Sequence, residues 1–143
     1  MLARLLAIVA TALSVGGFLL TADIHARAME LRRPPLSFWG QLPTLAFLAV
    51  PYLLGFASAV AARRSLVPAG VVLVGCALNA LIVYAAWRHH LRWSLIELTL
   101  VLLERWVYQF LVCSLVVAGG IEGVKQARRR RAEPTMPPSA GTM

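Results

Sequence analysis

The chain has 143 residues, of which 59% are hydrophobic and 14% are charged, and its mean hydropathy is +0.74. Soluble domains are about 45 to 50% apolar and about 25% charged, so this composition excludes an ordinary water-soluble globular domain. The length allows one domain at most, and no block outside the apolar runs is large enough to bury an aqueous core. The composition therefore predicts a membrane protein.

The net charge of +8 comes mainly from arginine residues that lie between or after the apolar runs. Such placement is typical of topology signals beside membrane spans and of contacts with anionic lipid. No recognition helix or aromatic RNA-binding pattern accompanies these residues. We therefore predict no nucleic-acid partner, and we predict contacts with the lipid bilayer and its anionic headgroups instead.

The first apolar run covers about residues 2–22 and is long enough for a span, which needs about 20 residues. Its small residues recur at four-residue spacing, which lets a neighbouring helix approach closely. Arg4 and the small-x-small pattern at residues 26–28 also fit a signal peptide, although the run is longer than the usual apolar region of about 7 to 15 residues. A retained first helix is the prediction, and a signal peptide of residues 1–28 that is cleaved before Met29 is the alternative.

The second predicted span, about residues 42–62, follows a polar connection in which Pro34 and Pro35 stop any helix. Pro51 lies inside this span and removes one backbone hydrogen bond, so it predicts a kink. A kink that shapes the packing of the helices is favoured over a gating hinge, because membrane helices tolerate such prolines.

The third predicted span, about residues 66–87, is separated from the second only by residues 63–65. A connection this short predicts that the two helices form an antiparallel hairpin. Asn79 is the strongly polar side chain within the third span, and we interpret it as a hydrogen-bonding group between helices.

The fourth apolar run, about residues 95–120, carries Glu97, Glu104 and Arg105. A charge at the centre of a membrane helix costs about 2.5 to 3.5 kcal/mol for Asp, Lys or Arg on insertion scales, so ionisable residues in such runs are functional candidates. Helix geometry places Tyr52, Asn79 and Glu104 at similar depths, about 12 to 15 Å from the outer surface of the membrane. The candidate intramembrane polar site consists of Glu97, Glu104, Arg105, Tyr108, Asn79 and Tyr52.

Three interpretations of these charges are open. In the first, Glu97 and Glu104 form a proton or cation relay, with hydrogen bonds from Tyr108 and Asn79. In the second, the charges form a buried structural network. In the third, the span begins near Trp106, and Glu104 and Arg105 lie among the lipid headgroups.

His25, His89 and His90 lie at predicted span ends on the outer side, and Asp23 is near them, so they are weak candidates for zinc or haem ligands. Their spacing matches no recognised motif, and we predict no metal and no cofactor. Cys76 and Cys113 are single residues within apolar runs and are interpreted as small buried hydrophobic groups.

Residues 1–124 are predicted to form the transmembrane domain, and residues 125–143 a disordered, basic, Pro-rich tail. An even number of spans places both termini on one side, and the distribution of basic residues predicts that this side is the cytoplasm. Basic residues at the start of the tail are expected to contact anionic lipid headgroups; they are Lys125, Arg128, Arg129, Arg130 and Arg131.

The predicted fold class is an all-α membrane protein, an antiparallel four-helix transmembrane bundle in a plasma or bacterial inner membrane. No nucleotide-binding, hydrolase or metalloprotease motif is present in the sequence, so no enzymatic activity is predicted. The favoured function is an accessory or scaffold protein that associates with another membrane protein or with itself. The alternative is a small oligomeric proton- or cation-linked transporter that uses Glu104 and neighbouring polar residues.

Overall fold

The computed structural model describes residues 1–30, 37–90 and 95–132; within these ranges it leaves undescribed the side chains of Ala28, Phe38, His89, His90 and residues 95–105. Four helices make up the described chain: α1 (Leu2–Glu30), α2 (Phe38–Ala62), α3 (Leu66–His90) and α4 (Leu95–Ala132). Each contains a segment that is long and apolar enough to cross a membrane: Leu2–Arg27, Trp39–Ala62, Leu66–Arg88 and Trp106–Ala132. The prediction of an all-helical chain with four candidate spans is confirmed.

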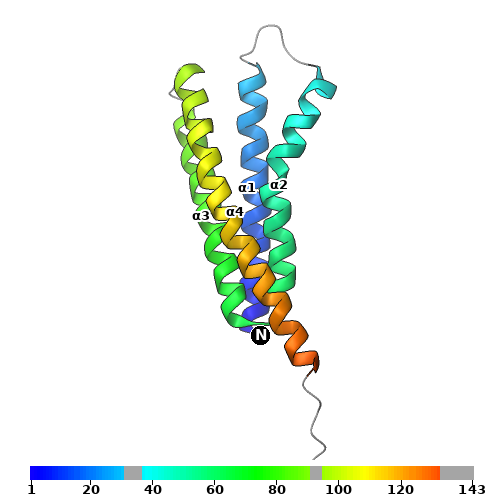
Figure 1. The fold of residues 1–143 in the computed structure, drawn as a ribbon. Coiled ribbons are helices and arrows are strands. Elements are labelled where there is room, and N and C mark those ends of the chain that lie inside the picture. The colour runs from blue at the N-terminus through cyan, green and yellow to red at the C-terminus, as the bar shows by residue number, and fades with distance from the viewer. Residues whose placement is uncertain (31–36, 91–94, 133–143) are drawn as a thin grey trace, which may run out of the picture.

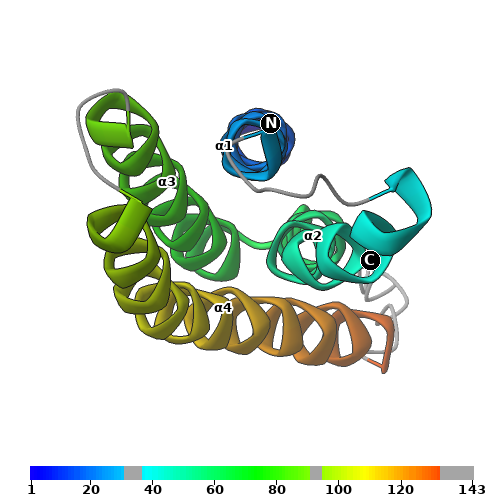
Figure 2. The same cartoon turned by 90° about the horizontal axis from the view of Figure 1, so that it is seen from above.

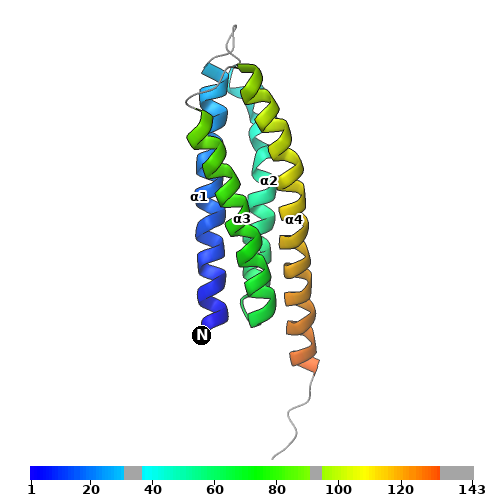
Figure 3. The same ribbon diagram turned by 90° about the vertical axis from the view of Figure 1, so that its left-hand side faces the viewer.

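The helices pack around one another in a four-cornered arrangement (Figure 2). Among the described residues, α1 and α4 each contact α2 and α3 but do not contact each other, so they occupy opposite corners (Figures 2 and 3). The N-terminus, the α2–α3 connection and the C-terminal end of α4 lie at the same end of the molecule (Figure 1).

The first helix extends beyond the predicted span, which ended near residue 22, and continues to Glu30. Ile24 and His25 in this extension are buried, and Asp23 forms an ion pair with Arg27 one turn later at 2.9 Å. Such pairs at four-residue spacing stabilise helices by about 0.2 to 0.5 kcal/mol. The extension therefore forms because its polar residues satisfy one another while its apolar residues pack, and α1 supplies part of the core.

The second helix begins at Phe38, before the predicted start near residue 42, because Ser37 caps it. The Ser37 hydroxyl accepts a hydrogen bond from the backbone N–H of Gly40 at 3.3 Å, which satisfies one of the free donors of the first turn. Pro51 lies inside the helix, and Figure 1 shows the N-terminal part of α2 leaning away from α1. The missing N–H of a proline explains a bend of this kind.

The fourth helix differs from the prediction at its C-terminal end, because it continues through the basic run from Lys125 to Ala132. Alanine, glutamine, lysine and arginine are good helix formers, and cations are stabilised near the C-terminal end of the helix dipole. Arg130 also donates a hydrogen bond from Nη1 to the Arg64 carbonyl at 3.3 Å. Residues 133–143, the rest of the predicted disordered tail, lie outside the described residues.

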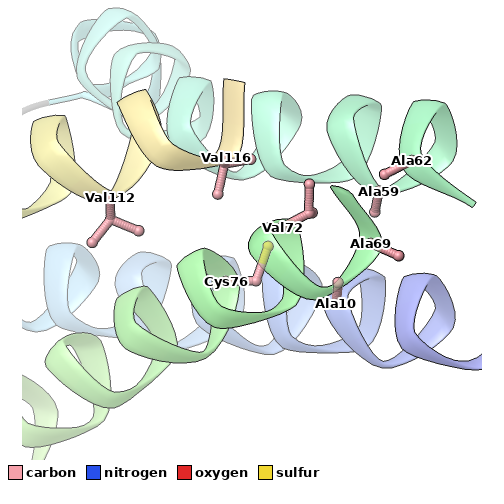
Figure 4. Close-up of a cluster of buried hydrophobic side chains, with 8 residues drawn as sticks. All are labelled: Ala10, Ala59, Ala62, Ala69, Val72, Cys76, Val112 and Val116. Atoms are coloured by element: carbon pink, nitrogen blue, oxygen red, sulfur yellow. The ribbon is translucent and has the colours of Figure 1, made fainter. Parts of the chain in front are cut away.

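Small side chains from all four helices form the main buried cluster (Figure 4): Ala10, Ala59, Ala62, Ala69, Val72, Cys76, Val112 and Val116. Glycines in α4 bring its backbone against α2. A Cβ atom added at Gly120 would lie 2.6 Å from Ser58 Oγ, and one at Gly123 would lie 2.7 Å from Ala62 Cα. Small residues that permit such close approach are typical of helix contacts in membranes.

Candidate functional site

A chain of hydrogen bonds crosses the interior between three helices. Gln109 on α4 donates from Nε2 to the Tyr52 hydroxyl on α2 at 3.2 Å, and this hydroxyl is hydrogen-bonded to Thr21 on α1. Thr21 Oγ1 in turn donates to the Gly17 carbonyl at 2.9 Å. Because a hydroxyl has one hydrogen, Tyr52 must be the donor to Thr21. The chain therefore runs in one direction, Gln109 to Tyr52 to Thr21 to Gly17.

The aromatic ring of Tyr52 is positioned by α1. A Cβ atom added at Gly17 would lie 2.8 Å from Cε1 of this ring, so only glycine leaves the space that the ring occupies. Phe18 packs edge-on against the same ring, with 5.8 Å between ring centroids. Tyr52 is 4% exposed, so its hydroxyl depends on Thr21 and Gln109 for hydrogen bonding in place of water.

A small cavity lies beside Gln109 and has a volume of about 10 Å³. It is lined from all four helices by Ser14, Pro51, Gly55, Cys76, Asn79, Gln109, Val112, Cys113 and Val116. Ser14 Oγ and Cys76 Sγ lie 3.3 Å apart within hydrogen-bonding distance, whereas the buried Asn79 Oδ1 has no hydrogen-bond partner. A volume of about 10 to 15 Å³ is the smallest that holds a water molecule.

A further polar contact joins α1 to α3 near the C-terminal ends of both helices. Asp23 Oδ2 accepts a hydrogen bond from Trp87 Nε1 at 2.7 Å and another from Arg27 Nε at 2.9 Å. Hydrogen bonds to a carboxylate are stronger than those between neutral groups. The contact therefore fixes the C-terminal part of α1 against α3.

The structure brings some of the predicted polar residues together. Tyr52 and Asn79 are both buried, and Gln109 connects their surroundings because it bonds to Tyr52 and lines the cavity of Asn79. Tyr108, in contrast, is 48% exposed and takes no part in this interior cluster. The predicted side chains of Glu97, Glu104 and Arg105 belong to α4 but lie outside the described residues.

Sequence reasoning missed Gln109 and Thr21. An amide within an apolar run was a usable signal, since the same criterion selected Asn79. The seven-residue spacing of Glu97 and Glu104 favours the helix face that also carries Tyr108, and Gln109 lies about 100° away from that face. Thr21 lies at the end of the predicted first span, whereas in the structure α1 continues to Glu30 and Thr21 is buried.

Of the predicted metal and haem candidates, Asp23 and His25 have side chains that the structure describes. Asp23 is bound to Arg27 and Trp87, and His25 is buried with Nε2 lacking a partner. Within the part of the chain that the structure describes, no three His, Cys, Asp or Glu residues form a group that could hold a metal ion. The side chains of His89 and His90 lie outside that part.

No family model, curated protein or solved structure matches this chain. Among the described residues, the hydrogen bonds that link α1, α2 and α4 involve an amide, two hydroxyls and a backbone carbonyl. Groups of these types can join membrane helices to one another.

The basic residues predicted to meet lipid headgroups lie on the last turns of α4. Lys125, Arg128, Arg129, Arg130 and Arg131 are all exposed. Arg130 is also tied to the α2–α3 connection through the Arg64 carbonyl. The positive charge of α4 is thus held beside the end of α2.

Proposed function

We propose that this chain is a small multi-pass integral membrane protein that serves as a non-enzymatic accessory or scaffold subunit of a membrane assembly. One observation carries the proposal: the interior polar groups of three helices are used on one another, in the chain from Gln109 through Tyr52 and Thr21 to Gly17. Beside this chain, the cavity lined by Asn79 has room for about one water molecule. Such an interior holds helices in place.

Membrane insertion is part of the proposal, and it is supported by the outward-facing side chains. Large apolar residues on every helix are strongly exposed, for example Ile8 (64%), Leu53 (64%), Val67 (69%) and Phe110 (74%). Contiguous apolar surface of this kind is rare on soluble monomers and marks contact with lipid or with another protein. We propose that lipid and a membrane-protein partner, or a second copy of the chain, cover it.

The antiparallel order of the spans is supported by contacts between neighbouring helices. Gly17 lies against Tyr52, and Ser14, which precedes it on α1, lies against Gly55, which follows Tyr52 on α2. Numbers that rise on α1 therefore pair with numbers that fall on α2. On α3 and α4 the same relation holds, since Gly75 lies against Val116 and Val72 lies against Gly119.

The cytoplasmic placement of the termini is supported by charge. Arg4, Arg63 and Arg64 line one cleft, and Arg130 in the basic end of α4 is hydrogen-bonded to the Arg64 carbonyl. Figure 1 shows the N-terminus and the C-terminal ends of α2 and α4 at the same end of the molecule. Basic residues beside membrane spans favour the cytoplasmic side. A reporter fused at the C-terminus is expected to be active only if it functions in the cytoplasm, and activity restricted to the opposite side would contradict this orientation.

Purification from native membranes tests the accessory function. We expect a tagged chain, extracted with a mild detergent, to carry a membrane protein in fixed stoichiometry or to form a defined homo-oligomer. Quantitative mass spectrometry and the mass of the intact complex measure both. A monomer with no stoichiometric partner would contradict the proposal.

The transporter alternative draws on Asn79, whose buried Oδ1 has no partner and borders a small cavity beside Gln109. It makes a different prediction for the same purified protein. Proteoliposomes should then show proton or cation flux that disappears in the Glu104→Gln variant while the protein stays folded. The accessory proposal expects no flux above that of protein-free liposomes, and flux that depends on Glu104 would replace it with the transporter.

A further inference from the structure

A cleft between α1 and α2, at the end of the molecule that carries the N-terminus, combines positive charge with an apolar lining. Its volume is about 720 Å³, and three exposed arginines line it: Arg4 from α1, and Arg63 and Arg64 at the end of α2. Small side chains, among them Ala7 and Ala12, leave the space between the two helices. The cleft is large enough for part of a lipid-sized molecule, since ligand pockets typically measure about 300 to 1,000 Å³.

Among the described residues that line this cleft, the charged side chains are all arginines and none is a carboxylate. The hydrogen bond from Arg130 Nη1 to the Arg64 carbonyl, at 3.3 Å, brings a further guanidinium beside the arginine pair. Guanidinium groups match phosphate geometrically and bind it through paired hydrogen bonds, so a phosphate is the anion that this group favours.

The other described residues that line the cleft supply few hydrogen-bonding groups to a polar ligand. Among the described lining residues other than the arginines, Thr11 is the one polar residue, and its hydroxyl already donates to the Ala7 carbonyl at 2.9 Å. A small hydrophilic anion would therefore find partners only at the arginines. An amphiphile with a phosphate head and a hydrocarbon chain matches both parts of the cleft.

We propose that this cleft binds one anionic phospholipid, with its phosphate at Arg4, Arg63 and Arg64 and an acyl chain against the small residues of α1 and α2. The inference rests on the proposed membrane insertion, and it assigns a site separate from the exposed basic run of α4. The arginines lie at the end assigned to the cytoplasm, where anionic lipids create the negative surface potential of the membrane. Basic pockets between membrane helices on this side are known to bind lipid headgroups.

Lipid binding can be measured on the full chain purified in a mild detergent and titrated with phosphatidylglycerol or phosphatidylcholine, with bound lipid counted by native mass spectrometry. We expect preferential binding of one phosphatidylglycerol. The triple variant Arg4→Gln/Arg63→Gln/Arg64→Gln should lose affinity by about fivefold for each arginine, on the order of 100-fold in total. The matched variant Lys125→Gln/Arg128→Gln/Arg129→Gln removes the same charge from α4 and should retain the preference.

A second variant distinguishes binding inside the cleft from attraction by surface charge alone. Ala12 lines the cleft and is exposed, so Ala12→Phe should fill the space without unfolding α1 and should lower phosphatidylglycerol binding although all the arginines remain. Val9→Phe, on an exposed position of the same helix, is the control and should bind normally. Unchanged binding in Ala12→Phe, or equal losses in the two triple variants, would overturn the proposal.

Two further outcomes are decisive. If inorganic phosphate displaces phosphatidylglycerol at similar concentrations, the site binds a free anion and the lipid assignment is wrong. Recovery of the chain in the membrane fraction without a headgroup preference would reject the lipid site alone. Recovery in the soluble fraction would reject the proposed membrane function itself, so the two failures are distinguishable.

Discussion

Gln109 on α4 donates a hydrogen bond to the hydroxyl of Tyr52 on α2, at 3.2 Å, in the interior of the protein. The Tyr52 hydroxyl in turn is bonded to Thr21, so one phenol connects α1, α2 and α4. In the chain, α3 separates α4 from both α1 and α2, so connectivity alone does not fix the position of α4 against them. The side-chain bonds therefore select one register among the many that apolar packing alone would permit.

The coupling of these residues can be measured. Tyr52→Phe removes the acceptor of the Gln109 amide and the hydroxyl that is bonded to Thr21, so we expect a loss of about 1 to 2 kcal/mol in the free energy of unfolding. Gln109→Leu removes only a donor, because Tyr52 still bonds to Thr21, and should cost about 0.6 kcal/mol, the average for such bonds in membranes. Detergent-induced unfolding followed by circular dichroism gives both values.

A double-mutant cycle completes this experiment. The combined Tyr52→Phe/Gln109→Leu variant should cost less than the sum of the single variants, because the second change removes the donor that the first left unpaired. Tyr84→Phe, at a residue that is 47% exposed, is the control and should change stability by less than about 0.5 kcal/mol. Strictly additive losses would show that the two side chains do not interact.

Because α2 and α4 approach each other closely, the effect of a glycine substitution on stability should depend strongly on which glycine is replaced. A Cβ atom at Gly120 would lie 2.6 Å from Ser58 Oγ and 3.0 Å from Ser58 Cα, so Gly120→Ala must push the helices apart. We expect a loss of about 1 to 3 kcal/mol in the free energy of unfolding. Gly70→Ala is the matched control, since nothing lies within 4 Å of its added Cβ, and it should be neutral or stabilising by up to about 1 kcal/mol.

The contact between Asp23 and Trp87 predicts a loss of stability when the indole donor is removed. Trp87→Phe preserves an aromatic ring but deletes the N–H that lies 2.7 Å from Asp23 Oδ2. Because Asp23 is partly exposed and keeps its bond to Arg27, we expect a modest cost, about 1 kcal/mol. Trp106→Phe still places an aromatic ring against Phe47, so it should lower the free energy of unfolding by less than Trp87→Phe does. A larger loss for Trp106→Phe would contradict this ranking.

The cavity beside Asn79 is expected to contain one ordered water molecule. It has a volume of about 10 Å³ and is bordered by Asn79, Gln109 and Ser14, which supply donors and acceptors. Buried water molecules typically make about three hydrogen bonds to such groups. A high-resolution experimental structure should show density within hydrogen-bonding distance of Asn79 Oδ1, and an empty cavity would disprove this expectation.

The amino-acid sequence by itself determined that the chain is helical and where its four long apolar helices lie. Long apolar runs separated by arginines and prolines are local features, and the hydropathy of about 20 residues depends on no other part of the chain. The burial of Tyr52 and Asn79 was predictable in the same way, since polar groups inside apolar runs need partners. The extensions of α1 to Glu30 and of α4 to Ala132 were less predictable from the sequence, because they depend on the Asp23–Arg27 and Arg130–Arg64 contacts.

Only the tertiary structure decided which polar groups meet. Tyr108 and Gln109 are adjacent in sequence, but a helix turns by about 100° per residue, so one is exposed and the other bonds to Tyr52. Which of the two faces inward depends on the rotation of α4 against α2, and that rotation is set by contacts such as Gly120 against Ser58 and Gly123 against Ala62. These contacts join residues far apart in the chain, so no local pattern specifies them.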